Sequence, residues 1–448
     1  MTFEQLELAF PDNGNGSSSF NDPAFAGNKA QPIHRWVPWI AGFAADFVKD
    51  VLARYVDNGA HVLDPFAGVG TTLVEAMLHG CHTTGFEINP YAALASRVKT
   101  SAHTASSGEL ENEIARFLVF FQEQMAAGAS PKSAPPLGFR TRGTFYSPKV
   151  LHKVLLAQDF IAAIRSEALR DLFRVAFAAT MVSYSNYSYE PSLGRRSSAG
   201  KPDIDDYPVE QALGGKLHQM AQDIAWFKAA IPPDTAPIAH VVHGSFFGYE
   251  NHLRPASVDL VITSPPYLNN YHYNRNTRPQ MYWLNLVDAP GDLKPLEENN
   301  FGKFWQTVRG GEPINLTFTL EGSDINERLA LIRSLHPEKG VYGGSGWANY
   351  AASYFNDCHR FVHAIKTVLK PGGTALIVIG NSILQGVAIP TDEYLGQIAV
   401  AAGLELAGID IPRKTRVGNS IIQSDVRVGK AQRKQRLYEA VVEIRQPR

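Results

Sequence analysis

A single strand–turn–helix–strand segment, about 30 residues long, constrains the fold more than any other part of the chain. A short apolar run, His61–Leu63, leads into the sequence Asp64-Pro-Phe-Ala-Gly68-Val-Gly70-Thr-Thr72. Apolar residues then recur with helical spacing over 73–78, and a second strand pattern runs from His82 to Glu87. This arrangement is the unit of a right-handed parallel α/β sheet. The sequence therefore predicts an open, mostly parallel sheet flanked by helices.

Composition narrows the class of protein. A chain of 448 residues is long enough for two to three domains, and no apolar run approaches the roughly 20 residues that cross a bilayer. The polar, acidic segment 1–22 has no signal-peptide pattern. Cys81 and Cys358 are the only cysteines, so we expect a reducing cytoplasm, no disulfide framework and no metal site.

The glycine turn indicates a ligand site. Gly68 and Gly70 allow the backbone to approach a ligand closely at the start of a helix, although such a turn also occurs where a helix merely packs on a strand. Glu87 ends the next strand, where a carboxylate can accept both hydroxyls of a ribose. The third glycine of a dinucleotide site is replaced by Leu73, and a P-loop lysine is absent. S-adenosylmethionine, which has a ribose and an amino acid but no phosphate, fits better, and Asp64 could hold its ammonium group.

A proline turn follows a later strand. The buried-strand pattern Val258–Thr263 ends in Ser264-Pro265-Pro266-Tyr267. Two prolines stiffen the turn and leave its carbonyls free to point into a cleft. Ser264 and the Pro265 carbonyl could accept the two hydrogens of an exocyclic amine while Tyr267 stacks on the ring. A base inside a duplex cannot reach such a turn, so base flipping is expected.

These two motifs together resemble the DNA amino-methyltransferase family, which contains N4-cytosine and N6-adenine enzymes. In that family the first motif binds S-adenosylmethionine and the second is catalytic. The resemblance implies an α/β fold with a Rossmann-like class I methyltransferase sheet, mostly parallel with an antiparallel last strand, interrupted by a helical insertion and a loop-rich insertion. It implies Ser264, Pro265, Pro266 and Tyr267 as the catalytic residues.

Further matches extend the resemblance to the rest of the cofactor site. The segment His34-Arg-Trp36-Val-Pro38-Trp39, continuing to Phe43, is similar to the part of the family that closes over the methionine end of the cofactor. Ser245-Phe246 stands where the family often has an aspartate near the adenine, and that aspartate is missing here. The expected cofactor-binding residues are His34, Trp36, Pro38, Asp64, Phe66, Ala67, Gly68, Gly70, Thr71, Thr72, Glu87, Ile88, Asn89, Ser245 and Phe246.

The target base and the substrate class are less constrained. Ser264 resembles the N4-cytosine subset, whereas an aspartate or asparagine at that position is typical of N6-adenine enzymes, so the sequence favours cytosine N4 with adenine N6 as the alternative. An RNA base methyltransferase, a non-catalytic DNA-binding subunit and a small-molecule methyltransferase remain as rival hypotheses. The preferred function is the modification enzyme of a restriction-modification system in the bacterial or archaeal cytoplasm, with a restriction endonuclease or another subunit as a candidate partner.

Double-stranded DNA is the expected substrate, although the net charge of −1 gives it no overall attraction. Phosphates are met by local patches, and 413–436 is rich in Lys and Arg. Aromatic, amide and cationic residues suited to base edges and phosphates also occur in both insertions. The candidate DNA contacts are Tyr187, Arg195, Arg196, Asn270, Tyr273, Arg275, Arg413, Lys414 and Arg416.

The chain divides into six parts on this interpretation. We expect two halves of a methyltransferase domain separated by two candidate DNA-recognition insertions, and a glycine-rich hinge or flexible loop at Tyr342–Gly346. The parts are a flexible N-terminal arm (1–30), the cofactor-binding first half (31–102), a mainly helical insertion (103–236), the catalytic strand and turn (237–267), a second insertion (268–345) and the second half (346–448).

Overall fold

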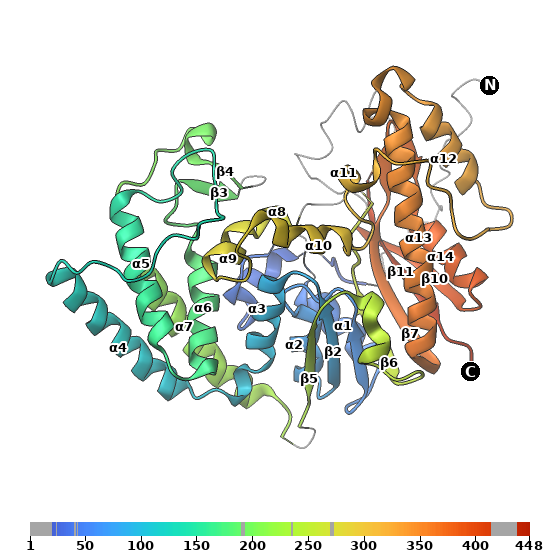
Figure 1. Ribbon diagram of the computed structural model, residues 1–448. Helices are drawn as coiled ribbons and strands as arrows, with labels where there is room; N and C mark the ends of the chain where they lie inside the picture. The colour runs from blue at the N-terminus through green and yellow to red at the C-terminus, as the bar shows by residue number, and fades with distance from the viewer. Residues whose placement is uncertain are drawn as a thin grey trace.

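A seven-stranded sheet forms the centre of the molecule (Figure 1), in the strand order β10-β11-β7-β6-β1-β2-β5. The computed structural model describes residues 20–23, 25–39, 42, 44–189, 193–233, 236–268, 273–413 and 437–448. The strands of the sheet are β1 (His61–Asp64), β2 (His82–Glu87), β5 (Ala239–His243), β6 (Val258–Thr263), β7 (Leu369–Gly380), β10 (Glu405–Arg413) and β11 (Glu439–Arg445).

The direction of the strands confirms the predicted class of sheet. The parallel part of the sheet consists of β5, β2, β1, β6 and β7, each paired with the next in this order. β11 runs antiparallel to both β7 and β10. The central strand β1 pairs Leu63 with Thr84 on one side and with Val261 on the other. An α/β sheet with an antiparallel last strand is therefore present.

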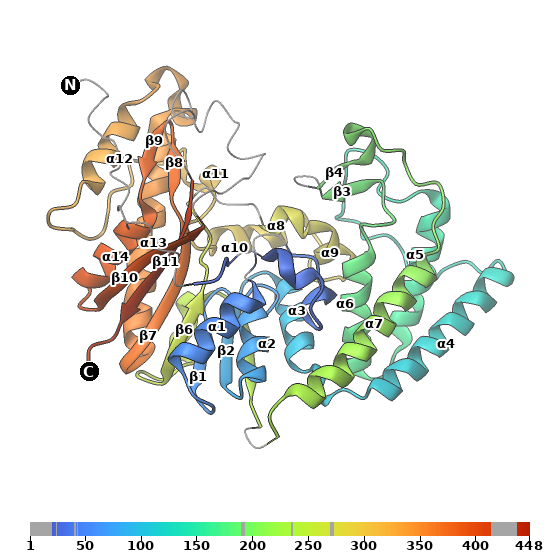
Figure 2. The same cartoon turned by 180° about the vertical axis from the view of Figure 1, so that it is seen from behind.

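Both faces of the sheet are covered by helices (Figure 2). α1 (Ala45–Tyr55) packs its buried face on β1, β6 and β7, because Phe47, Val48 and Val51 lie one helical turn apart or side by side. α13 (Gly344–Val368) and α14 (Thr391–Ala401) cover the opposite face. Strands enclosed on both faces are apolar throughout, which is why β6 and β7 read as continuous hydrophobic runs.

Helices from the segment between β2 and β5 form a lobe beside the sheet. They share one hydrophobic cluster with α2 (Thr71–Leu78), which follows the glycine turn. Ser106, Ser147 and Ser166 cap three of them, each accepting a hydrogen bond from the backbone N–H three residues later. The elements are α3 (Pro90–Thr100), α4 (Ser107–Ala126), α5 (Pro148–Ala163), α6 (Glu167–Thr180), α7 (Val209–Ala230) and the hairpin β3 (Tyr187–Tyr189) with β4 (Leu193–Arg195).

Short helices connect β6 to α13 and lie above the sheet in Figure 1. They are α8 (Tyr273–Asn276), α9 (Arg278–Trp283), α10 (Leu293–Glu298), α11 (Trp305–Val308) and α12 (Ile325–Ser334). A small hairpin, β8 (Ser382–Leu384) with β9 (Val387–Ile389), follows β7.

The glycine run before α13 is not the hinge or flexible loop that its composition suggested. Gly344 and Gly346 are buried in the first turn of α13. A Cβ at Gly344 would lie 1.7 Å from the Ile332 carbonyl oxygen, and one at Gly346 would lie 2.1 Å from the Val341 oxygen. These glycines are needed for close packing of the helix end against the preceding backbone.

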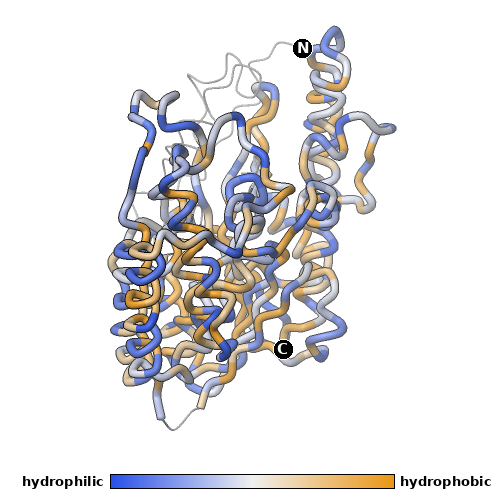
Figure 3. Tube along the Cα trace, turned by 60° about the vertical axis from the view of Figure 1, so that its left-hand side comes forward, coloured by the Kyte–Doolittle hydropathy of each residue, from blue (hydrophilic) through white to orange (hydrophobic). Residues whose placement is uncertain are grey.

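Hydropathy follows this arrangement. Figure 3 shows hydrophobic residues concentrated in the sheet and its covering helices, and hydrophilic residues in the peripheral loops. Across the described ranges, no helix is both long and apolar enough to cross a membrane.

Candidate active site

The glycine turn between β1 and α2 forms part of a cavity wall. Gly68 and Gly70 have φ angles of 52° and 81°, in the left-handed region that favours glycine. Their neighbours leave little room: a Cβ at Gly70 would lie 2.6 Å from Ser96 Oγ, and one at Gly68 would lie 3.4 Å from Trp39 Nε1. Gly70 thus allows α2 to approach α3, whereas Gly68 lies in the wall of the cavity itself.

Glu87 lies at the carboxyl end of β2, facing the same turn. Its Oε2 accepts a hydrogen bond from Gly68 N (2.9 Å) and its Oε1 accepts one from Asn89 N (2.6 Å). Burial raises the pKa of Glu87 to about 7, although these backbone donors oppose the shift. Two backbone bonds therefore fix the carboxylate while each oxygen keeps further acceptor capacity.

Asn89 connects this edge of the sheet to the second insertion. Its side-chain oxygen caps α3 by accepting from Tyr91 N and Ala92 N. Its Nδ2 donates to Asn274 Oδ1 (3.1 Å) and Thr277 Oγ1 (2.7 Å). Because Asn274 also lines the cavity, Asn89 holds a wall residue of the second insertion against the cofactor half of the sheet.

The proline turn after β6 reaches the same cavity. Ser264 and Pro266 line it, whereas Pro265 is buried. Ser264 Oγ donates to the Tyr267 hydroxyl (3.4 Å), which in turn donates to Glu439 Oε1 on β11 (3.4 Å). The Tyr267 ring packs against the cluster beneath α13. Ser264, Tyr267 and a carboxylate from the last strand thus form a chain of hydrogen bonds at this edge of the sheet.

One pocket brings the predicted motifs together. It is partly open to solvent, and its cavity volume is about 80 Å³. Of the predicted residues, the pocket wall contains Phe66, Gly68, Glu87, Ile88, Asn89, Ser245, Phe246, Ser264 and Pro266. Residues that sequence reasoning did not assign to the site complete the wall: Trp39, Pro65, Phe86, Gly244, Asn274, Asn299, Asn300 and Phe301.

Asp64 does not lie in the pocket wall, which argues against its expected contact with an ammonium group. The side chain is 1% exposed, and its Oδ1 accepts from Thr263 Oγ1 (2.7 Å) and Phe66 N (3.0 Å). Burial raises its pKa to about 6. Asp64 joins the end of β1 to the end of β6 and so fixes the glycine turn relative to the proline turn.

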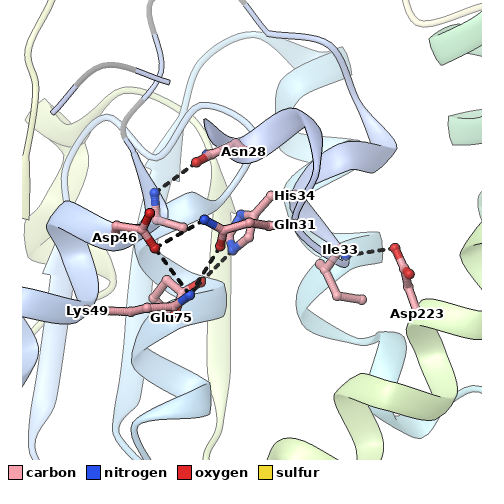
Figure 4. A network of polar contacts seen from close by, with 9 residues as sticks. Asn28, Gln31, Ile33, His34, Asp46, Lys49, Glu75 and Asp223 are labelled. Atoms are coloured by element: carbon pink, nitrogen blue, oxygen red, sulfur yellow. Dashed lines mark hydrogen bonds and ion pairs between the residues drawn. The ribbon is translucent and has the colours of Figure 1, made fainter. Parts of the chain in front are cut away.

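His34 and Trp36 do not line the pocket, contrary to the expected contact with the methionine end of the cofactor. Figure 4 shows the His34 side chain beside Glu75. His34 Nε2 and Glu75 Oε1 on α2 are 2.6 Å apart, and burial lowers the pKa of His34. Trp36 Nε1 donates to Asp223 Oδ2 on α7 (2.9 Å). The segment is anchored to two helices, and Trp39, three residues further on, is its contribution to the pocket.

The remaining predicted cofactor residues are structural neighbours of the pocket. Ala67 N donates to the Phe86 carbonyl (2.9 Å), which joins the turn to β2. Thr71 and Thr72 are buried in the first turn of α2, and Pro38 is exposed beside Trp39. None of them, nor Gly70, lines the pocket.

The candidate DNA contacts divide into three groups. Arg195 and Arg275 are exposed, whereas Arg196 is half-buried and its Nε donates to the Pro202 carbonyl (2.9 Å). Tyr187 is 6% exposed, packs on Phe145 and accepts from Gly143 N with its hydroxyl, which is the position of a core residue rather than of a DNA contact. Asn270, Lys414 and Arg416 lie outside the described residues, as do the side chains of Tyr273 and Arg413.

The comparisons with known proteins agree with this constellation. Residues 24–97, which include the glycine turn and Glu87, match the model of a family described as DNA methylase, N6/N4 type. This segment of the chain is therefore similar to N6/N4 DNA methylases.

Distant relatives extend beyond the matched segment. The chain is 24% identical over 440 residues to the type II methyltransferase M.BsoBI of Geobacillus stearothermophilus, covering 89% of this chain and 83% of the relative. It is 22% identical over 350 residues to the type II methyltransferase M.MvaI of Kocuria varians, and this alignment covers 75% of this chain and 73% of the relative.

Solved structures also align over most of the chain, at low scores. An rRNA methyltransferase, aviRa, from Streptomyces viridochromogenes aligns over 95% of this chain and 94% of its own, with 9% identity and a TM-score of 0.31. A geranyl diphosphate methyltransferase aligns over 96% of this chain and 88% of its own, with 8% identity and a TM-score of 0.30.

The residues of this pocket fit S-adenosylmethionine. The fixed Glu87 carboxylate suits the hydroxyls of a ribose, the apolar side chains suit an adenine, and Gly68 lets a ligand approach the backbone closely. No group of three or more His, Cys, Asp or Glu side chains within the described ranges is arranged to hold a metal ion.

Proposed function

We propose that this chain is the modification methyltransferase of a restriction-modification system and transfers a methyl group to N4 of a cytosine flipped out of double-stranded DNA. The observation that carries the proposal is that Ser264 and Pro266 of the proline turn line the same pocket as Glu87 and Gly68. The type II methyltransferases among its relatives support the role in restriction-modification.

Glu87 would hold the ribose of the cofactor. Its carboxylate has both oxygens fixed by backbone N–H groups and can accept the two ribose hydroxyls with its remaining lone pairs. Ile88 and Phe246, on neighbouring strand ends, would enclose the adenine, and Gly68 would let the rest of the cofactor pass close to the backbone. S-adenosylmethionine supplies the methyl group when it is bound.

Ser264 would prepare the nitrogen of the base for attack. Its Oγ and the Pro265 carbonyl would accept the two amine hydrogens, which concentrates the nitrogen lone pair toward the methyl group. The nitrogen would form a bond to the methyl carbon while the bond between this carbon and the sulfonium sulfur breaks, with S-adenosylhomocysteine as the leaving group. The extra proton on nitrogen would pass to solvent, so no cysteine nucleophile is required. Both described cysteines agree with this assignment, because burial raises the pKa of Cys81 to about 11 and that of Cys358 well above its usual value.

Tyr267 would stack on the flipped base. In the structure its hydroxyl lies between Ser264 Oγ and Glu439 Oε1, so the ring is next to the serine that would grip the amine. Stacking on an aromatic ring offsets part of the free-energy cost of unstacking the base from the duplex.

Ser264 also favours cytosine over adenine, and N6 of adenine is the second candidate. Asn274, a residue of the second insertion, lies in the pocket with Ser264 and would distinguish the two bases by hydrogen bonds. The exposed cations Arg195 and Arg275 would meet DNA phosphates. A restriction endonuclease is the partner that this role implies.

Transfer of labelled methyl groups tests the reaction directly. The purified chain, unmethylated plasmid DNA and radiolabelled S-adenosylmethionine should give acid-insoluble label in DNA, and Ser264→Ala should give little. Label in transfer RNA in place of DNA would indicate an RNA enzyme. Cofactor binding without transfer to either nucleic acid would indicate a non-catalytic subunit and would contradict the proposal.

A further inference from the structure

Asn300 has an amide group with an unmet hydrogen-bonding requirement inside the pocket. The side chain is 9% exposed, it lines the pocket, and its Nδ2 has no hydrogen-bond partner among the described residues. A buried amide without a partner costs about 1–3 kcal/mol, so such a group in a ligand site points to a ligand that completes it.

The loop that carries Asn300 is rigid. Gly302 N donates to Asp357 Oδ2 on α13 (2.9 Å), and the contact is buried. A Cβ at Gly302 would lie 2.6 Å from Tyr354 Cδ2, and the Phe301 ring meets the Tyr354 ring edge-on at 5.4 Å. Lys303 N closes the turn on the Asn300 carbonyl (3.1 Å). The amide is thus held in place before any ligand arrives.

The contacts of this loop place Asn300 at one end of the pocket. Phe301 stacks on Phe247 with ring centroids 6.2 Å apart, and Phe247 directly follows Ser245 and Phe246 in the turn after β5. Phe246 in turn meets Phe86 of β2 at 5.2 Å. Asn300 therefore lies at the end where the adenine of the cofactor would be enclosed.

That end of the pocket needs a polar group. Ser245 lies at this end of the pocket, but its Oγ already caps the following turn by accepting from Phe247 N (3.4 Å). Adenine presents an amine donor beside a ring-nitrogen acceptor. An asparagine amide matches that pair with one acceptor and one donor.

We propose that Asn300 recognises the adenine of S-adenosylmethionine, with its Oδ1 accepting from the 6-amino group and its Nδ2 donating to the adjacent ring nitrogen. The inference rests on the proposed cofactor pocket and adds a specificity residue supplied by the second insertion.

Binding of two ligands without DNA tests this assignment. The ligands are S-adenosylhomocysteine and its analogue with hydrogen in place of the 6-amino group, titrated calorimetrically into the full chain. The native protein should prefer the amino compound by about tenfold, equivalent to about 1.4 kcal/mol. Asn300→Ala should weaken the amino compound by about tenfold and reduce the preference to near one.

Two further variants separate recognition from structure. Asn300→Asp keeps the shape and the acceptor and should keep the preference for the amino compound. Glu298→Ala is the matched control, because Glu298 is close to Asn300 in sequence but is 54% exposed, pairs with Lys294 (3.5 Å) and does not line the pocket; its binding should be that of the native protein.

The other possible results of these titrations would each contradict one part of the proposal. Equal weakening of both ligands in Asn300→Ala, with the preference retained, would mean that Asn300 only supports the pocket. Unchanged affinities, or an effect confined to the KM for DNA, would place Asn300 toward the target base. If the native chain bound neither ligand, the proposed cofactor pocket itself would be wrong.

Discussion

At the scale of single residues, the protonation state of Glu87 determines whether its carboxylate can accept hydrogen bonds from both hydroxyls of a ribose. Burial raises its pKa to about 7, so in the free protein its ionisation costs stability as the pH rises from the ordinary value toward 7. Ribose hydroxyls donate hydrogen bonds, and only the ionised carboxylate can accept two of them with both oxygens. Cofactor binding is therefore favoured on the alkaline side of the Glu87 pKa.

The affinity for S-adenosylhomocysteine should consequently increase with pH. Below about pH 7 protons compete with the ligand, so we expect a rise of up to tenfold per pH unit that levels off above this value. Glu87→Gln should weaken binding by about 1–3 kcal/mol and remove the difference between pH 6 and pH 7.5. Calorimetric titration across this range measures both effects, and the same pH dependence in Glu87→Gln would assign it to another group, such as Asp64.

Ser264 should matter for turnover and not for cofactor affinity. Ser264→Ala removes an acceptor that acts on the amine during transfer, so kcat should fall by roughly 100-fold or more. Its dissociation constant for S-adenosylhomocysteine should stay at the native value. Single-turnover rates and calorimetry separate the two; native turnover in this variant would remove the serine from the mechanism.

Sequence reasoning identified the residues of the pocket that act through a local motif. Gly68 and Glu87 are separated by one helix of a common unit, and Ser264 follows a strand directly, so each was recognisable without tertiary information. Asn300 was not, because it lies between short helices in an aperiodic insertion. Only the packing of Phe301 on Phe247 brings it to the pocket.

At the scale of elements, one carboxylate anchors the segment before α1 to the helical lobe. Asp223 on α7 accepts hydrogen bonds from Ile33 N (2.9 Å), Arg35 Nε (3.1 Å) and Trp36 Nε1 (2.9 Å). Its side chain is 2% exposed. The following residues lead to Trp39 in the pocket wall, so this anchor positions part of the site from a distance.

Asp223→Ala should therefore destabilise the protein strongly. It leaves buried donors without a partner and a guanidinium without its carboxylate, and we expect the free energy of unfolding to fall by about 3 kcal/mol. Urea unfolding followed by circular dichroism measures the change. Asp46→Ala is the control, since the Asp46 carboxylate is 65% exposed and accepts from Gln31; an equal loss there would refute the anchoring role.

Elements were predictable where one pattern determined them. Strands β1 and β6 were recognisable from short apolar runs, because parallel strands enclosed by helices are buried on both faces. His34 and Trp36 were assigned to the cofactor from resemblance alone. The structure places them against α2 and α7, and the partners Glu75 and Asp223 are 41 and 187 residues away in sequence, beyond the reach of any local pattern.

At the scale of the whole molecule, both insertions lie at the same edge of the sheet. Figures 1 and 2 show hairpin β3–β4 on one side of α8–α10 and helices α11 and α12 on the other. The exposed cations Arg195 and Arg275 belong to these two insertions. With a net charge of −1, attraction to DNA must come from such local groups.

The DNA affinity should depend on salt through these cations. Replacing Arg195 and Arg275 by Ala should each reduce the slope of log K against log salt concentration by about one if each meets one phosphate. The affinity for S-adenosylhomocysteine should not change. Fluorescence anisotropy with a labelled duplex at several salt concentrations measures the slope, and a native slope in the double variant would place the DNA elsewhere on the surface.

The identity of the methylated base tests the central claim most directly. DNA from cells that express the chain is digested to nucleosides and analysed by mass spectrometry, with Ser264→Ala as the matched control. We predict N4-methylcytosine with the native chain and none with the variant. N6-methyladenine in its place would contradict the assignment of cytosine, and the absence of both methylated nucleosides would contradict the proposed reaction.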